Sequence, residues 1–180
     1  MPHVRVIGLA VQTRDGFIAR EPGHSTIDWR SNADATFFTD FLNGLGEEDV
    51  IVVGNNTYKT VRRLSRRNCI VLTRSVTSTA QRNPKLLYCN PEGASLTAAL
   101  GRYRTAVLLG GTETYTLFLK QNLIDEIYLT VEPVKFGSGL RLFDSPEDIG
   151  QLFYLEWTER LSEEGTFLRH YLRKVPYVRA

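Results

Sequence analysis

The stretch that decides the fold is VLLGGTETY, at residues 107–115. Its apolar start predicts a short buried strand. Directly after Gly110-Gly111, the residues Tyr115, Phe118 and Leu119 fall at helical spacing, which predicts a helix. Glycine lets another group approach the backbone closely, and the amides at a helix start favour an anion such as a diphosphate. A tight turn without a ligand fits the same pattern, so other parts of the chain have to decide.

The chain has the composition of an ordinary globular protein, with 42% hydrophobic and 23% charged residues in a length of 180. These values predict one domain over residues 1–175, followed by a loose tail at 176–180. The net charge of +2 is too small to indicate a nucleic-acid surface. No apolar stretch approaches the roughly 20 residues that span a bilayer, and the apolar run at residues 4–11 is too short for a signal peptide.

The cysteines and histidines indicate neither disulfides nor a metal. Cys69 and Cys89 lack the spacing of a redox motif, which favours reduced thiols in a cytoplasmic protein. The three histidines are scattered, so we expect no metal site. The expected partner is a small-molecule substrate, with no nucleic acid and no membrane, and the protein is expected to be a monomer or a homodimer.

Short apolar runs alternate with helical patterns along the chain. The predicted strands are Val4–Val11, Val50–Val53, Cys69–Leu72, Leu86–Cys89, Thr105–Leu109 and Glu126–Val131, with a closing hairpin of Tyr154–Arg160 and Thr166–Lys174. The predicted helices are Ser31–Leu45, Thr57–Val61 with Asn55 or Asn56 as its cap, Ser95–Tyr103, and the helix after the glycines. This order predicts an α/β fold with a mostly parallel central sheet, flanked by helices and extended by a C-terminal antiparallel hairpin.

The predicted topology also indicates where a ligand should bind. In such sheets, ligands lie beyond the carboxyl ends of the parallel strands. Gly54, Thr73 and Gly110 follow predicted strands, and the loop Gln12–His24 follows the first one. A loop of this length inside a compact domain is often functional. We therefore expect these positions to converge on one site.

Asp34 has two interpretations that the sequence leaves open. Ser31-Asn32-Ala33-Asp34 before an apolar run is close to a capping box, in which the Asp34 carboxylate would accept from the amide of Ser31. The second interpretation is catalytic, because Trp29, Phe37 and Phe38 are near in sequence. A carboxylate among aromatic rings can have a raised pKa and transfer protons, or pair with a flat heterocycle.

Several cationic and hydroxyl side chains could bind an anion. Four arginines lie close to Leu64 in the sequence: Arg62, Arg63, Arg66 and Arg67. They form either a solvated basic loop or a group that holds a carboxylate or phosphate of the substrate. Thr73-Arg74-Ser75 ends a strand at the expected ligand edge, as an ordinary turn or as a site for a nucleotide phosphate. Tyr115 and Thr130 fit the core and a strand without any functional role.

Taken in order, these motifs resemble the dihydrofolate reductase superfamily over nearly the whole chain, from Val4 to about Lys174. No single motif is specific, but their order is. The matching parts are Trp29, Asp34, Phe38, Gly54, Thr57, the strand end Val71-Leu72-Thr73-Arg74, Gly110-Gly111 with Tyr115, and Thr130.

The resemblance implies a reductase that uses NADPH. It implies that Asp34 binds a pterin and serves its protonation, that Trp29 closes the site and orders water, and that Thr130 hydrogen-bonds toward Asp34. The implied substrate-binding residues are Ala10, Phe38, Leu64 and Arg67, where Arg67, or Arg66 as second choice, would hold the glutamate carboxylate of a folate. The implied cofactor-binding residues are Gly54, Thr57, Thr73, Arg74, Gly110, Gly111, Thr112 and Tyr115.

Other segments resemble a second branch of the superfamily, the pyrimidine reductases of riboflavin biosynthesis. They are Asp15-Gly16-Phe17-Ile18, Leu123-Ile124-Asp125-Glu126-Ile127, and Pro133 with Phe136-Gly137-Ser138-Gly139. That branch reduces the ribose of an aminopyrimidine, again with NADPH. A third alternative, from a different class, is a catalytically silent nucleotide-binding domain in which Asp34 is only a cap.

Two departures from the folate enzymes concern the cofactor. Asn55 follows Gly54 where those enzymes usually carry a basic residue that helps to hold the 2′-phosphate of NADPH, and Glu113 adds a negative charge near the glycine turn. Arg74 is the remaining candidate for that phosphate, which leaves NADH, and also a flavin, open as the bound nucleotide. Reduction of a pteridine such as dihydrofolate by NADPH is the expectation, with the riboflavin-type reaction as the alternative.

Overall fold

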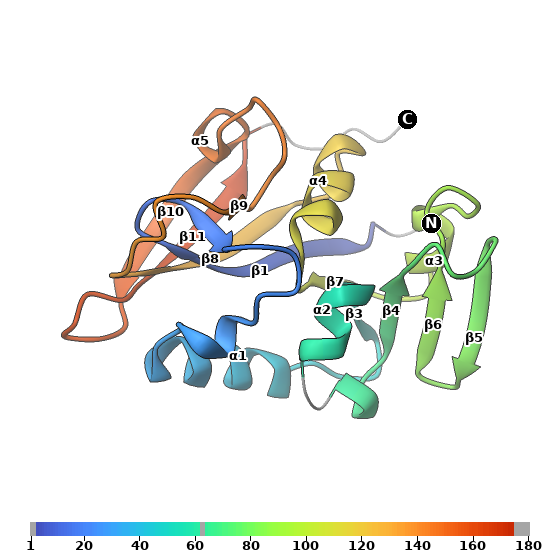
Figure 1. Ribbon diagram of the computed structural model, residues 1–180. Helices are drawn as coiled ribbons and strands as arrows, with labels where there is room; N and C mark the ends of the chain where they lie inside the picture. Colours follow the sequence, from blue (N-terminus) through green and yellow to red (C-terminus); the bar gives the residue numbers. More distant parts are fainter. Residues whose placement is uncertain (1–2, 62–63, 175–180) are drawn as a thin grey trace.

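The computed structural model describes residues 3–61 and 64–174, which form a nine-stranded sheet with helices on both faces (Figure 1). In spatial order the strands are β10 (Phe153–Arg160), β11 (Phe167–Arg173), β8 (Glu126–Glu132), β1 (Arg5–Thr13), β7 (Thr105–Leu108), β3 (Asp49–Gly54), β4 (Cys69–Leu72), β6 (Leu86–Cys89) and β5 (Thr79–Asn83). The strands from β8 to β6 run parallel, whereas β11, β10 and β5 are antiparallel to their neighbours. The predicted α/β class and the C-terminal hairpin are therefore confirmed.

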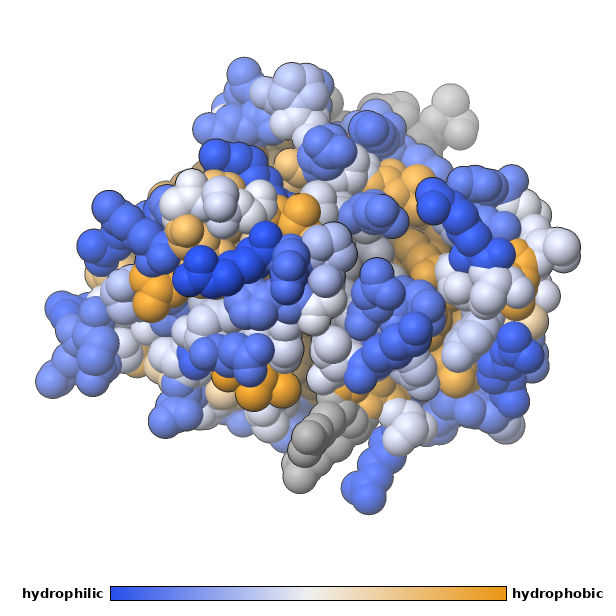
Figure 2. Space-filling model, viewed as in Figure 1, coloured by the Kyte–Doolittle hydropathy of each residue, from blue (hydrophilic) through white to orange (hydrophobic). Residues whose placement is uncertain are grey.

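Helices cover the two faces of this sheet. They are α1 (Asn32–Asn43), α2 (Asn55–Thr60), α3 (Leu96–Leu100), α4 (Thr112–Lys120) and α5 (Ile149–Leu152), with 3-10 turns η1 (Thr26–Asp28) and η2 (Leu64–Arg66). Figure 1 shows α1 on one side of the sheet and α4 on the other. Hydrophilic residues cover most of the face seen in Figure 2, with smaller hydrophobic areas between them.

Burial of both faces explains why the central strands are continuously apolar. In β3, Val50 and Val52 belong to the core cluster that contains the helix α4, whereas Ile51 and Val53 belong to the cluster on the α1 side. All four side chains are fully buried. A strand that alternates between apolar and polar residues could not fill both layers.

The loop predicted over Gln12–His24 is more regular than expected. β1 continues to Thr13, and β2 (Phe17–Ala19) pairs with β9 (Leu140–Arg141) in a small second sheet. The Asp15 carboxylate connects the turn before β2 with the loop before β9. It accepts from the Thr13 hydroxyl at 2.6 Å and from the Gly137 amide at 2.7 Å. These hydrogen bonds, that of Thr13 foremost, lower the pKa of Asp15 to about 2. Strands this short leave no periodic signal in the sequence.

The helices α2 and α3 have bounds that differ from the sequence prediction. α2 begins earlier than expected, with Gly54 as its N-cap, so neither Asn55 nor Asn56 caps it. α3 is capped by the Ser95 hydroxyl but ends at Leu100, with Gly101 as its C-cap. Within residues 3–61 and 64–174, none of the helices is long and apolar enough to cross a membrane. The predicted tail at 176–180, and Arg62 and Arg63, lie outside the described residues.

Candidate active site

A cleft of about 1650 Å³ opens where the parallel strands end. Gly54 at the end of β3, Thr73 after β4 and Gly110 after β7 all line it, together with residues 18–19 and 21–27 of the loop after β1. The convergence predicted from the topology is thus present. Pockets for one small molecule usually measure about 300–1000 Å³. The cleft is therefore large enough for two ligands side by side.

The turn after β7 packs tightly against β3. The Gly54 amide donates to the Gly110 carbonyl at 2.8 Å, and a Cβ added to Gly54 would lie 3.1 Å from the Thr114 hydroxyl. Gly110 has a φ of +103°, and a Cβ there would lie 3.2 Å from the Tyr115 ring. The fold itself therefore favours glycine at position 110, because its φ would strain any other residue and a side chain would crowd the Tyr115 ring.

Gly111 differs, because no neighbour in the described structure requires glycine there. Its φ of −80° is open to any residue, and an added Cβ would meet nothing closer than the Thr57 hydroxyl at 3.6 Å. The space beside Gly111 belongs to the cleft. A glycine that the protein does not need for its own packing fits a site that a ligand approaches closely.

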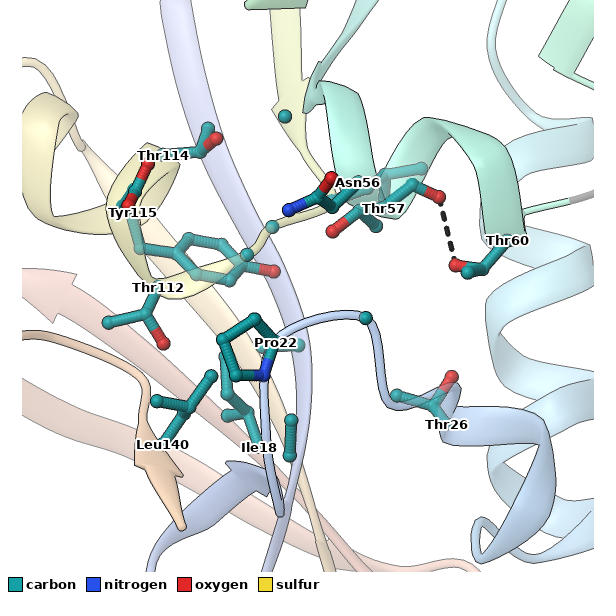
Figure 3. Close-up of a pocket in the computed structure, with 18 of the residues that line it drawn as sticks. Ile18, Pro22, Thr26, Asn56, Thr57, Thr60, Thr112, Thr114, Tyr115 and Leu140 are labelled. Carbon is teal, nitrogen blue, oxygen red and sulfur yellow. Dashed lines mark hydrogen bonds between the residues drawn. The ribbon is translucent and has the colours of Figure 1, made fainter.

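Two helices begin on this cleft without a side-chain cap. α4 starts after Gly111 and α2 starts after Gly54, and neither N-cap residue has a side chain that could accept from the first amides. Figure 3 shows Thr57 of α2 and Tyr115 of α4 lining the same pocket. Amides at helix starts, with the positive end of the helix dipole, favour phosphate groups. These residues therefore fit the diphosphate of a dinucleotide.

Tyr115 and Thr112 hold this wall in place. The Tyr115 hydroxyl donates to the Leu9 carbonyl at 2.7 Å, which ties α4 to β1 beneath the cleft. Burial raises the pKa of Tyr115, so the phenol stays protonated. The Thr112 hydroxyl donates to the Arg141 carbonyl at 2.5 Å, which ties the start of α4 to β9.

The rim near Thr73 carries charges of both signs. The Thr73 hydroxyl accepts from the Ser75 amide at 3.1 Å and so forms a local turn. Arg74 is exposed, and its Nε lies 3.2 Å from Glu92. Asn55 and Glu113 also line the cleft. Arg74 is therefore in place to contact a ligand, but it faces competition from a carboxylate.

Asp34 lies in the cleft wall and is only 3% exposed. The Ser31 hydroxyl accepts from the Asp34 amide at 3.1 Å, so Ser31 is the N-cap of α1 as the capping pattern predicts. The second half of the capping box is absent, because the Ser31 amide donates to Glu132 at 2.7 Å. The capping interpretation of the Asp34 carboxylate is therefore wrong, and its oxygens are left for the cleft.

The surroundings of Asp34 favour its protonated form. Burial raises the pKa of Asp34 to about 6, and the buried Glu132 adds to the rise, whereas the Thr130 hydroxyl and Arg30 oppose it. The Thr130 hydroxyl is buried close enough to Asp34 to lower its pKa, but within the described residues its oxygen has no partner at hydrogen-bond geometry. A carboxyl group that titrates near neutral pH can both donate and accept a proton.

The other predicted substrate and catalytic residues divide into two groups. Ala10 and Phe38 line the cleft, whereas Trp29, Thr130, Leu64 and Arg67 are not part of its lining. Trp29 packs edge-on against Phe136 at 5.1 Å between ring centres.

Arg67 and Leu64 serve the fold. Arg67 donates to the Leu42 carbonyl at 3.0 Å and to the Asn43 side chain at 2.8 Å, at the end of α1. Leu64 is buried in the core. Arg66 does not line the cleft either.

Arg30 is a cleft residue that the sequence interpretation missed. It lines the cleft four residues before Asp34, and one of its terminal nitrogens lies 3.8 Å from an Asp34 oxygen. Its position directly after Trp29 and four residues before Asp34 is the sequence signal that could have identified it.

Comparisons with known proteins agree with this fold. The family model for dihydrofolate reductase matches residues 5–140. An uncharacterized protein of Bacillus subtilis (strain 168), YwjB, is 30% identical over 151 residues, which are 79% of this chain and 84% of the relative. The match covers more than half of the chain, and the protein therefore belongs to the dihydrofolate reductase family.

Two solved structures share the fold at low sequence identity. One is described as a candidate riboflavin biosynthesis protein from Shewanella sp. PV-4, with a TM-score of 0.69, 24% identity, and coverage of 96% of this chain and 100% of that one. The other is a dihydrofolate reductase from Enterococcus faecalis in complex with NADP(H) and RAB-propyl, with a TM-score of 0.68, 19% identity, and coverage of 95% and 97%.

Proposed function

We propose that this protein is an NADPH-dependent reductase that transfers a hydride to a pteridine such as dihydrofolate. The observation that carries the proposal is the buried Asp34 carboxyl, with its pKa near 6, in the same cleft as the Gly110-Gly111 turn. Family membership and the size of the cleft support it.

The residues of this chain would divide the work between two subsites. The amides at the start of α4 and the open backbone at Gly111 would hold the diphosphate, with Thr57 and Gly54 on the opposite side. When bound, the nicotinamide ring would supply the hydride. Phe38 and Ala10 would flank the heterocycle.

Asp34 would anchor the heterocycle and move a proton. An ionised carboxylate accepts two parallel hydrogen bonds from a ring N–H and a neighbouring amino group. With a pKa near 6, the same group can carry a proton to the ring near neutral pH. Trp29 and Thr130 would act from outside the cleft lining, Thr130 through Asp34.

The reductase of the riboflavin pathway remains the second candidate, and one observation favours it. The segments that resemble that branch, at residues 15–18 and 136–139, are joined by the hydrogen bonds from Gly137 and Phe136 to Asp15. Within these segments, Ile18 and Gly139 line the cleft. A silent nucleotide-binding domain is less well supported, because it needs Asp34 to act only as a cap.

The test is NADPH oxidation followed by absorbance, with dihydrofolate and the riboflavin aminopyrimidine offered separately. We expect turnover with dihydrofolate. Turnover with the aminopyrimidine alone would support the second candidate, and consumption with neither substrate would contradict both reductase assignments.

A further inference from the structure

Arg30 places a guanidinium group in the cleft directly beside Asp34. Its side chain is 19% exposed, and its terminal nitrogen lies 3.8 Å from the nearer Asp34 oxygen. The guanidinium carbon lies 5.1 Å from the centre of the Phe38 ring. A cation and a carboxyl group therefore stand next to each other beside an aromatic ring, at the position proposed for the heterocycle.

The guanidinium donors of Arg30 have no hydrogen-bond acceptor among residues 3–61 and 64–174. Its backbone amide donates to Thr26, but among the described residues its guanidinium forms no hydrogen bond. A guanidinium carries five N–H donors, and burying a charged group without acceptors costs free energy. An acceptor from a ligand in the cleft would satisfy these donors.

The contact with Asp34 does not satisfy the hydrogen-bond donors of Arg30. Charge-assisted hydrogen bonds between arginine and a carboxylate measure about 2.7–2.9 Å, whereas the distance here is 3.8 Å. The positive charge of Arg30 lowers the pKa of Asp34, but burial of the carboxyl group raises it by more, so the pKa stays above its ordinary value. Arg30 and Asp34 are thus neighbours whose hydrogen-bonding groups remain available.

We propose that Arg30 and Asp34 together recognise a lactam edge, which we define as a ring carbonyl next to a ring N–H. Asp34 accepts from the N–H, and Arg30 donates to the adjacent carbonyl oxygen. This inference rests on the proposed function, because it assumes that a heterocycle binds at Asp34. It narrows the substrate class to 4-oxo heterocycles, whether pteridine or pyrimidine.

The same geometry disfavours a 4-amino group. In a 2,4-diamino heterocycle, the carbonyl is replaced by an amino group, which would turn its N–H donors toward the Arg30 donors. A site built to hydrogen-bond one group rejects an analogue that lacks it, because the buried polar group is then left without a partner. Arg30 thus acts as the specificity-determining residue of the substrate subsite.

The test is equilibrium binding of two probes at pH 8, where Asp34 is ionised because its pKa is near 6. The probes are 2-amino-4-oxopteridine and 2,4-diaminopteridine, and the readout is quenching of pteridine fluorescence without cofactor. We expect the wild type to prefer the 4-oxo probe at least tenfold. In Arg30→Met, binding of the 4-oxo probe should weaken at least tenfold, while binding of the diamino probe stays equal or tightens.

Arg82→Met is the matched control. Its guanidinium lies 4.7 Å from the Tyr88 ring, a contact similar to that of Arg30, but on β5 at the far edge of the sheet. Binding of both probes should be unchanged in this variant. Arg30→Gln, which keeps amide donors without the charge, repeats the comparison should the methionine variant fold poorly, and should retain part of the preference.

The outcomes separate this inference from the proposed function. If Arg30→Met weakens both probes equally, or the wild type prefers the diamino probe, Arg30 does not read the carbonyl and the inference is overturned, while Asp34 keeps its proposed role. If the wild type binds neither probe, the pteridine proposal fails and the inference falls with it.

Discussion

The Glu132 carboxylate accepts a hydrogen bond from the backbone amide of Ser31, with 2.7 Å between the two atoms. Its second oxygen accepts from the Thr166 hydroxyl at 2.8 Å. Glu132 therefore takes the place that a capping box would give to Asp34, and it fixes the start of α1 from β8. The carboxyl group of Asp34 is left in the cleft wall without a capping role.

Replacement of Asp34 should stabilise the protein at high pH. The folded-state pKa of about 6 lies above the ordinary value of 3.8, so the native state binds the proton more tightly than the unfolded chain does. Stability therefore falls as the pH rises through this window. Asp34→Asn removes the penalty, which is at most about 3 kcal/mol. Thermal unfolding from pH 4 to pH 8 should show a gain in Tm that grows with pH.

The matched control is Asp40→Asn, at an exposed position of the same helix. Its Tm should follow that of the wild type over the same pH range. An Asp34→Asn variant that melts below the wild type at pH 8 would show that the buried carboxylate is stabilised by contacts other than those described.

The two glycines of the turn should respond to substitution in opposite ways. Gly110→Ala forces a side chain into a φ of +103° and against Tyr115, so Tm should fall by several degrees. A Cβ added at Gly111 meets no close neighbour, and the methyl groups of Gly111→Val would extend into the cleft. The fold should therefore persist while NADPH binding weakens at least tenfold, which is about 1.4 kcal/mol. Calorimetry and NADPH titration measure the two effects. Unchanged NADPH affinity in folded Gly111→Val would remove the diphosphate from this turn.

Arg67 should matter for stability and not for substrate binding. Its hydrogen bonds to Leu42 and Asn43 hold the end of α1, and each such bond contributes about 1 kcal/mol. Arg67→Ala should therefore lower Tm and leave the KM for substrate unchanged. Arg66→Ala, at the exposed neighbouring position, is the control. A higher KM at constant Tm would restore Arg67 to the substrate site.

Arg74 should set the choice between NADPH and NADH. A charge-assisted contact with the 2′-phosphate contributes roughly 1.5–3 kcal/mol. Arg74→Ala should weaken NADPH binding and leave NADH nearly unchanged, and Glu92→Gln should tighten NADPH binding by removing the competing carboxylate. Equal losses for both cofactors on titration would give Arg74 a structural role instead.

The fold could be predicted because its signals are local. Continuous apolar runs such as Val50–Val53 show strands buried on both faces, and the parallel topology then brings Gly54 and Gly110 to one edge. Asp34 could be singled out from its neighbours in the sequence. The sequence could not show whether Asp34 caps α1 or lies free in the cleft. That depends on Glu132, which is far along the chain and accepts the hydrogen bond from the Ser31 amide.

The arginines show the same limit of local patterns. Arg67 and Arg30 are alike as residue types, and it is the tertiary structure that places Arg67 at the end of α1 and Arg30 in the cleft. The strands β2 and β9 were missed for a related reason. Each is too short for a periodic pattern, and they pair with each other across a long separation in sequence.

The most direct test of the central claim is the turnover of Asp34→Asn, measured as NADPH oxidation from pH 5 to pH 8 with the substrate that the wild type accepts. If Asp34 anchors and protonates the heterocycle, the folded variant should still bind NADPH. Its turnover should fall on the order of 100-fold, with a smaller deficit at low pH, where solvent supplies the proton. Wild-type turnover in a folded Asp34→Asn protein would contradict the account.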